Sequence, residues 1–279
     1  MDIYGPSKHC AGPSVAIHNP YASPPTTRVY PMPSFCGTVV PVAPREAGAP
    51  VREALVALHT GYAMLDLASG AVTPLFNPER TPETRWNDGK ASPEGRFWAG
   101  TMGEPGKVRD GAGGLFVLER DRATARKALG DITISNGLAW HGATMYYIDT
   151  PAGVVFAFNY DAATGAIANK RTAFAIPAGT GHPDGCCIDA AGNLWVAQWG
   201  GSRVVAYRTA DGAVLAEVRL PATNVSSVTF GGADLDDLYI TTAKEHLSAE
   251  ELAAQPHAGD MFIVRKCGFK GVPACFYQG

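Results

Sequence analysis

The feature that most constrains this chain is an internal repeat. Four segments share one order: a small polar residue, a short strand pattern, a turn with glycine and a strand rich in aromatic residues. They begin at Asn87, Asn136, Asp184 and Ser226, which are 49, 48 and 42 residues apart. Each segment has the pattern of a β-hairpin. A repeat of this length with only strand patterns is typical of four-stranded propeller blades. We therefore predict an all-β chain, a β-propeller.

A single helix is predicted outside this pattern, over residues 248–254. Ser248 can cap it, and two glutamates follow near its positively polarised end. No linker-like stretch interrupts the strand pattern. We therefore expect one propeller domain over residues 28–279, preceded by a divergent segment, residues 1–27, rich in Pro, Ser and Ala.

Composition excludes several classes of function. The net charge is −3 and basic runs are short, so we expect no nucleic-acid partner. No apolar run is long enough for a membrane span, and the first residues lack the pattern of a secretory signal, so a cytoplasmic protein is expected. The six cysteines form no CxxC pair and show no zinc-ligand spacing. We interpret them as mostly buried or free thiols, with a Cys267–Cys275 bridge left open.

The repeat also has a geometric consequence. The innermost strands of propeller blades converge at one mouth of the central channel, so Asn87, Asn136, Asp184 and Ser226 are expected to meet there. Oxygen-bearing side chains suit a hard cation such as Ca²⁺ or Mg²⁺, with zinc or manganese as alternatives. A second interpretation stays open, because Asn-Gly and Asp-Gly are common turn dipeptides and polar residues can line a wet channel without a metal.

Several of these segments resemble the motifs of one known family. Residues 85–90 together with residues 98–102 are similar to the most specific motif of the regucalcin, gluconolactonase and luciferin-regenerating enzyme family. Residues 136–140, 182–185 and 230–241 resemble the motifs that follow, in the same order. The resemblance extends over most of the chain.

This resemblance implies a six-bladed β-propeller with one divalent cation, held by a Glu, an Asn and an Asp. It implies hydrolysis of sugar lactones such as gluconolactone, and some members are linked to calcium handling. The Asn ligand corresponds to Asn136 and the Asp ligand to Asp184. Family substrate contacts correspond to Arg85 and Asn87, and Glu104 lies near a further one. Ca²⁺ is the expected cation, with Zn²⁺, Mn²⁺ or Mg²⁺ as alternatives.

The start of the chain departs from the family pattern. The Glu ligand of the family belongs to an N-terminal motif, and Met1-Asp2-Ile3 resembles the end of the strand that follows this motif. We therefore expect an N-terminally shortened member with an incomplete first blade and two of the three protein ligands. Asp2 is the only acidic residue before Glu46 that could replace the Glu.

The resemblance leads to a mechanism of metal-assisted hydrolysis, in which the cation polarises the lactone carbonyl and Asp184 orients or deprotonates the attacking water. Arg85 and Asn87 would hold the substrate. Two alternatives stay open. One is a non-catalytic or weakly active calcium-binding propeller, and the other is a hydrolase of another ester, such as a phosphotriester.

Overall fold

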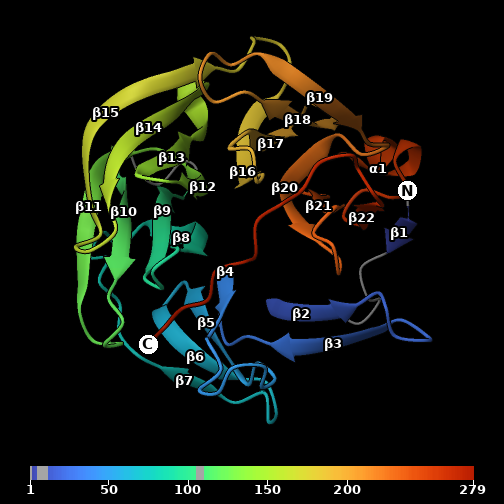
Figure 1. Cartoon of the computed structure of the whole chain (residues 1–279). Helices are drawn as coiled ribbons and strands as arrows, with labels where there is room; N and C mark the ends of the chain where they lie inside the picture. Colours follow the sequence, from blue (N-terminus) through green and yellow to red (C-terminus); the bar gives the residue numbers. More distant parts are fainter. Residues whose placement is uncertain (1, 5–11, 105–109) are drawn as a thin grey trace. The chain divides into compact units, whose positions relative to one another are not determined.

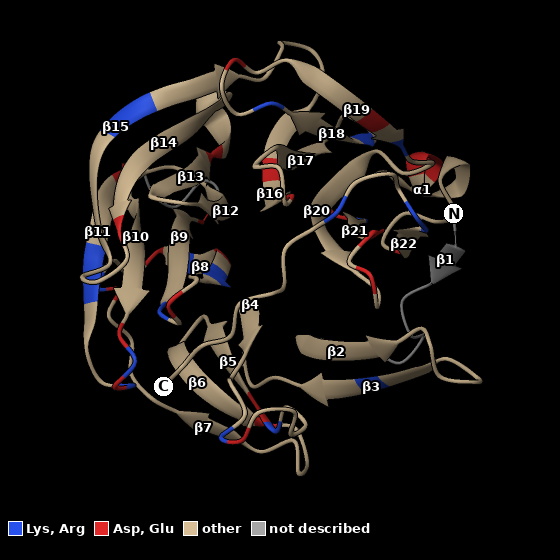
Figure 2. Cartoon of the chain, viewed as in Figure 1, with Lys and Arg blue, Asp and Glu red and all other residues tan. Residues whose placement is uncertain are grey.

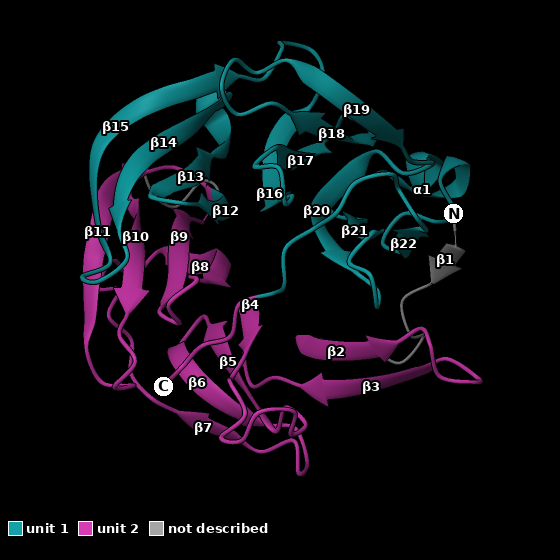
Figure 3. Cartoon of the chain, viewed as in Figure 1, with its two compact units in different colours: residues 1–6, 136–274 teal, residues 7–135, 275–279 magenta. Residues whose placement is uncertain are grey.

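The computed structural model describes the backbone of residues 2–4, and residues 12–104 and 110–279 (Figure 1). Nearly all of its regular structure is β-strand, as predicted. The chain divides into two compact units (Figure 3). Unit 1 contains residues 1–6 and 136–274, and unit 2 contains residues 7–135 and 275–279.

Unit 2 contains three antiparallel sheets whose strands pair in chain order. A two-stranded sheet consists of β2 (Ser14–Asn19) and β3 (Thr26–Pro31). A four-stranded sheet consists of β4 (Cys36–Pro41), β5 (Glu53–Leu58), β6 (Gly61–Asp66) and β7 (Val72–Pro74). The other four-stranded sheet consists of β8 (Thr84–Ala91), β9 (Phe97–Gly103), β10 (Gly113–Leu118) and β11 (Ala125–Ile132).

Unit 1 contains two further sheets. The first consists of β12 (Ser135–His141), β13 (Thr144–Asp149), β14 (Val154–Asp161) and β15 (Ala166–Ala175), with the 3₁₀ turn η1 (Thr150–Ala152) after β13. The second has eight strands: β16 (His182–Ile188), β17 (Leu194–Trp199), β18 (Arg203–Tyr207), β19 (Val214–Arg219), β20 (Asn224–Gly231), β21 (Asp237–Ala243), β22 (Met261–Val264) and β1 (Asp2–Tyr4). Strands β16 to β19 form one half of this sheet, and β20 to β22 with β1 form the other. The two halves join through a single residue pair, Trp199 of β17 with Asn224 of β20.

The predicted helix is confirmed as α1 (Ala249–Ala254). Ser248 caps it, since its hydroxyl accepts from the Glu251 amide at 3.2 Å while the Glu251 carboxylate accepts from the Ser248 amide at 2.8 Å. This reciprocal pair is a capping box, which satisfies two amides at the helix start. No helix within the described residues is long and apolar enough to cross a membrane.

The middle strands of the larger sheets form the core because both of their faces are covered. All of β10 is buried, and so is all of β5 apart from Glu53. The outer strands β11, β15 and β19 carry exposed polar residues instead. In unit 2 the Tyr62 ring centroid lies 4.7 Å from that of Trp86. Tyr277 completes this core, and its hydroxyl donates to the Glu119 carbonyl at 2.6 Å.

The sheets follow the predicted repeat: Asn87, Asn136, Asp184 and Ser226 lie on β8, β12, β16 and β20, the first strands of successive meanders. The number of blades and the incompleteness of the first stay predictions. The predicted domain boundary after residue 27 falls inside β3, and the division itself stays a prediction.

Two minor expectations concern cysteines and charge. Cys267 and Cys275 are free thiols, so the bridge left open from the sequence does not form. Cys10 lies outside the described residues. Figure 2 shows acidic and basic residues scattered over the strands and loops of both units, in keeping with the small net charge of −3.

Candidate functional site

Asn87 and Asp88 lie in a β-bulge of β8. Trp86 pairs with Thr101 and Gly89 pairs with Ala99, so the two residues between them face one residue of β9. A bulge bends its strand, interrupts the ladder and re-aims side chains. The polar residue at the head of the repeat is therefore turned out of the regular alternation of the sheet.

The same irregularity recurs at two other repeat positions, both in unit 1. In β16, Pro183 pairs with Gln198 and Cys186 with Val196, which leaves Asp184 and Gly185 in a bulge. In β20 the register shifts between Val225 and Ser227, at Ser226. Sequence periodicity places these residues at strand starts but does not predict the bulges.

Glycines allow the strands that begin the successive meanders of unit 1, β12, β16 and β20, to lie close to one another. A Cβ built on Gly137 of β12 would stand 2.7 Å from the Asp184 carbonyl oxygen. A Cβ on Gly185 of β16 would stand 2.8 Å from the Ser226 carbonyl oxygen. Ordinary carbon contacts are about 3.5 Å or longer, so a side chain at either position would push the strands apart. Asn136 and Asp184 therefore lie on adjacent strands.

Asn136 is buried, with 6% of its surface exposed, and its Nδ2 donates to Thr150 Oγ1 at 2.7 Å. Thr150 is the first residue of η1, and its hydroxyl donates to the Pro183 carbonyl at 2.8 Å. Asp184, the next residue, is half-buried. One hydroxyl thus links the Asn136 side chain to the backbone just before Asp184.

In unit 2 the structure brings Arg85 and Asn87 together. Arg85 Nη1 donates to Asn87 Oδ1 at 3.0 Å, and Asn87 Nδ2 donates to the Ser135 carbonyl at 2.8 Å. The Arg85 guanidinium also lies 4.5 Å from the ring centroid of Phe35, a cation–π distance. These contacts hold the positively charged guanidinium of Arg85 beside the side-chain amide of Asn87.

Glu104 follows β9, and its amide donates to the Glu83 carbonyl at 2.9 Å. Its Oε1 lies 3.9 Å from His59 Nδ1, a long and partly exposed contact. The segment directly after it, residues 105–109, lies outside the described residues. The role of Glu104 in substrate binding stays a prediction.

Asp88 is a residue that the sequence did not single out. Desolvation raises the pKa of its carboxyl, although the Lys90 charge and the Gly89 amide, which donates at 2.7 Å, both act to lower it. A carboxyl with a perturbed pKa beside predicted substrate contacts is a candidate for proton transfer. Its position after Asn87 in the strand could be read from the sequence, but the desolvation of its carboxyl could not.

The predicted site residues fall on both units. Asn136 and Asp184 are brought together in unit 1, whereas Arg85, Asn87 and Glu104 belong to unit 2. The meeting of all five at one site stays a prediction. The side chain of Asp2 lies outside the described residues.

The oxygen donors of unit 1 fit a hard cation. Within residues 12–104 and 110–279 no group of three His, Cys, Asp or Glu side chains could hold a metal. The predicted ligands are instead one amide and one carboxylate, on strands held together by Gly137. Such oxygen donors suit Ca²⁺ and Mg²⁺, which complete their coordination with water.

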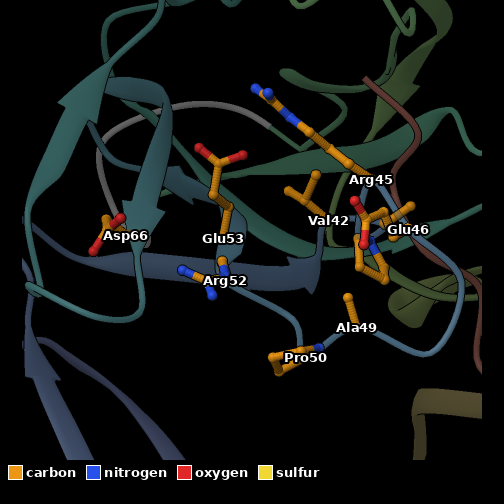
Figure 4. Close-up of a pocket in the computed structure, with 10 residues that line it drawn as sticks. Val42, Arg45, Glu46, Ala49, Pro50, Arg52, Glu53 and Asp66 are labelled. Atoms are coloured by element: carbon orange, nitrogen blue, oxygen red, sulfur yellow. The ribbon is translucent and has the colours of Figure 1, made fainter.

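A pocket of about 470 Å³ lies elsewhere, in unit 2 (Figure 4). It is formed by the loop between β4 and β5, by Glu53 at the start of β5 and by Asp66 of β6, and none of the predicted site residues lines it. Glu53 in its wall pairs with Arg122 at 3.3 Å. Its charged residues carry both signs, since arginines and acidic residues both line it.

Residues 2–244 match the family model described as the SMP-30/Gluconolactonase/LRE-like region. The chain belongs to this family. It is 41% identical to the regucalcin of Danio rerio over 240 residues, which cover 85% of this chain and 80% of that protein. The resemblance found in the motifs is thereby confirmed.

The similarity to solved structures is consistent with this family. A luciferin-regenerating enzyme is 31% identical, with a TM-score of 0.83, covering 95% of this chain and 88% of that one. A regucalcin from Agrobacterium tumefaciens, described as a calcium-binding protein, is 28% identical, with a TM-score of 0.81, covering 90% and 82%. The fold is therefore that of the regucalcin-type propellers.

Proposed function

We propose that this chain hydrolyses sugar lactones with the help of a divalent cation held by Asn136 and Asp184. The observation that carries the proposal is the close passage of β12 along β16, where Gly137 lies against the Asp184 backbone. This passage puts an amide oxygen and a carboxylate on adjacent strands. The family takes part of its description from gluconolactonase.

Ca²⁺ is the proposed cation, because both protein donors are oxygen atoms and a 28% identical relative is described as a calcium-binding protein. Zn²⁺, Mn²⁺ or Mg²⁺ could use the same donors. When bound, the cation would polarise the lactone carbonyl and stabilise the oxyanion that develops on it.

The side chains supply the rest of the reaction. Asp184 accepts a proton from the attacking water, whose oxygen bonds to the carbonyl carbon. The bond from that carbon to the ring oxygen then breaks, and the ring oxygen takes up a proton to give a hydroxy acid. Arg85, held by Asn87, binds oxygen atoms of the substrate. Solvent water supplies the proton that the ring oxygen takes up.

A second candidate keeps the cation and removes the catalysis. The chain would then be a calcium-binding propeller, a function favoured by its likeness to the Agrobacterium tumefaciens regucalcin, a calcium-binding protein. The two functions share the cation ligands and differ only in turnover.

The test is hydrolysis of glucono-δ-lactone by the purified chain, followed as acid release, with EDTA or with each of the four cations added. Asp184→Asn is the decisive variant. Asp234→Asn is its control, because Asp234 is an exposed carboxylate of the same unit.

Cation-dependent turnover that falls at least about 100-fold in Asp184→Asn and persists in Asp234→Asn would support the lactonase, since such losses are typical of a proton-transfer group. Cation binding without turnover, lost in Asp184→Asn, would favour the calcium-binding protein. Turnover unaffected by EDTA and by Asp184→Asn would contradict both.

A further inference from the structure

Thr150 decides which way the Asn136 amide faces. A threonine hydroxyl has one hydrogen to donate, and a carbonyl can only accept. Because the Thr150 hydroxyl donates to the Pro183 carbonyl at 2.8 Å, only its lone pairs remain for Asn136. The group of Asn136 that lies 2.7 Å away must therefore be its NH₂. The amide oxygen consequently faces away from Thr150.

The same hydroxyl also holds the other predicted ligand in place. Pro183 precedes Asp184, and Asp184 lies in the β16 bulge, where the ladder with β17 is interrupted. The backbone there lacks part of its ladder support, so a hydrogen bond from η1 restrains the peptide that carries Asp184. Thr150 thus touches the side chain of one ligand and the backbone beside the other.

We propose that Thr150 is a positioning residue, which orients the Asn136 amide oxygen and restrains Asp184 so that both present oxygen atoms to one divalent cation. This inference rests on the proposed function. Partners of this kind, which hold metal ligands without touching the metal, typically contribute about 10- to 100-fold to metal affinity.

Thr150→Val tests the proposal because it keeps the shape of the side chain and removes the hydroxyl. Thr150→Ser keeps the hydroxyl. Thr242→Val is the matched control, since the Thr242 hydroxyl also donates to a carbonyl, that of Asp260 at 2.8 Å, and accepts an N–H, that of Gly259 at 2.9 Å. It belongs to the same unit but contacts neither predicted ligand through its hydroxyl.

The first measurement is the Kd of Ca²⁺ by calorimetry, with the thermal unfolding midpoint of each calcium-free variant recorded beside it. We expect Thr150→Val to weaken Ca²⁺ binding by about 10-fold or more. Thr150→Ser should bind like the natural chain. Thr242→Val should lower the unfolding midpoint but leave the Kd unchanged. A natural Kd in Thr150→Val, or a Kd equally weakened in Thr150→Ser, would overturn the positioning role.

The second measurement needs no cation. In ¹⁵N-labelled protein, the Asn136 side-chain NH₂ signals should be shifted and protected from exchange, and Thr150→Val should remove both effects. If the natural chain binds no cation, the proposed function fails together with the cation part of this inference, while the NH₂ signals still report whether Thr150 orients Asn136. Unchanged NH₂ signals in Thr150→Val would overturn the orientation itself.

Discussion

A Cβ placed on Gly137 would stand 2.7 Å from the Asp184 carbonyl oxygen and 2.7 Å from Cys186 Sγ. Glycine is therefore required at this position by the neighbouring strand rather than by its own backbone angles. Because Asn136 precedes Gly137, the contact that demands glycine is also the contact that brings the two predicted cation ligands together.

Gly137→Ala should destabilise the protein by about 1–3 kcal/mol, the usual cost of overpacking a filled core, and should weaken cation binding as well. Gly130→Ala is the control, since Gly130 lies exposed on β11 with no atom within 4 Å of the added carbon. It should change stability by less than about 0.5 kcal/mol. Urea unfolding of both variants checks this, and equal losses would contradict the packing argument.

Arg85 and Asn87 should act as a unit on the substrate, because Arg85 Nη1 donates to Asn87 Oδ1 at 3.0 Å. Arg85→Ala and Asn87→Ala should each lower kcat/KM by about 10-fold or more, the cost of losing a hydrogen bond to a charged group. The double variant should lose less than the product of the two effects.

The control for this cycle is an exposed pair of the same chemistry, Arg171 and Asn159, which are joined at 2.9 Å. Alanine at either position should leave kcat/KM unchanged. Independent effects of Arg85 and Asn87, measured in the same lactone assay, would show that their contact does not matter for the substrate.

Asp88→Asn should stabilise the protein at neutral pH. Desolvation raises the folded-state pKa of Asp88 above its ordinary value of 3.8, so the charge costs the folded state stability as the pH rises through that pKa. The gain in Asp88→Asn should therefore be larger at about pH 7 than at about pH 4, as measured by urea unfolding.

Asp121→Asn should show the opposite sign. Hydrogen bonds from Thr124 and Ala123 lower the pKa of Asp121, so its charge stabilises the folded state above the unfolded-state pKa and the benefit is lost as the pH falls. The variant should thus be less stable than the natural chain at about pH 7, and the difference should shrink as the pH falls below about 4. A stability change of the same sign in Asp88→Asn and Asp121→Asn at about pH 7 would refute the opposite pKa shifts of the two carboxyls.

Two buried tyrosines should respond differently to loss of the hydroxyl. The Tyr62 hydroxyl has no hydrogen-bond partner among the described residues, so Tyr62→Phe should be neutral or stabilising. The Tyr277 hydroxyl donates to the Glu119 carbonyl at 2.6 Å, and Tyr277→Phe should cost about 1 kcal/mol. Thermal unfolding checks both, and a loss in Tyr62→Phe as large as that in Tyr277→Phe would point to a bound partner for Tyr62.

Several features were predictable from the sequence because they depend on local patterns. The all-β class, the helix capped by Ser248 and the position of Asn136 and Asp184 on equivalent strands follow from strand periodicity, turn glycines and one capping residue. The family also followed from the motifs, since residues 85–90 and 136–140 stand in its order and spacing. Each of these motifs is short, so the residues that form it are close together in the chain.

Other features were decided only by the tertiary structure. The bulge at Asp184, the desolvation of Asp88, the close passage of Gly137 and the hydrogen bonds of Thr150 all arise between residues far apart in the chain. A threonine or a glycine looks the same in sequence whether or not another strand lies against it. The residues proposed to carry the chemistry could therefore be named from the sequence, while the contacts that hold them arise only when the strands pack.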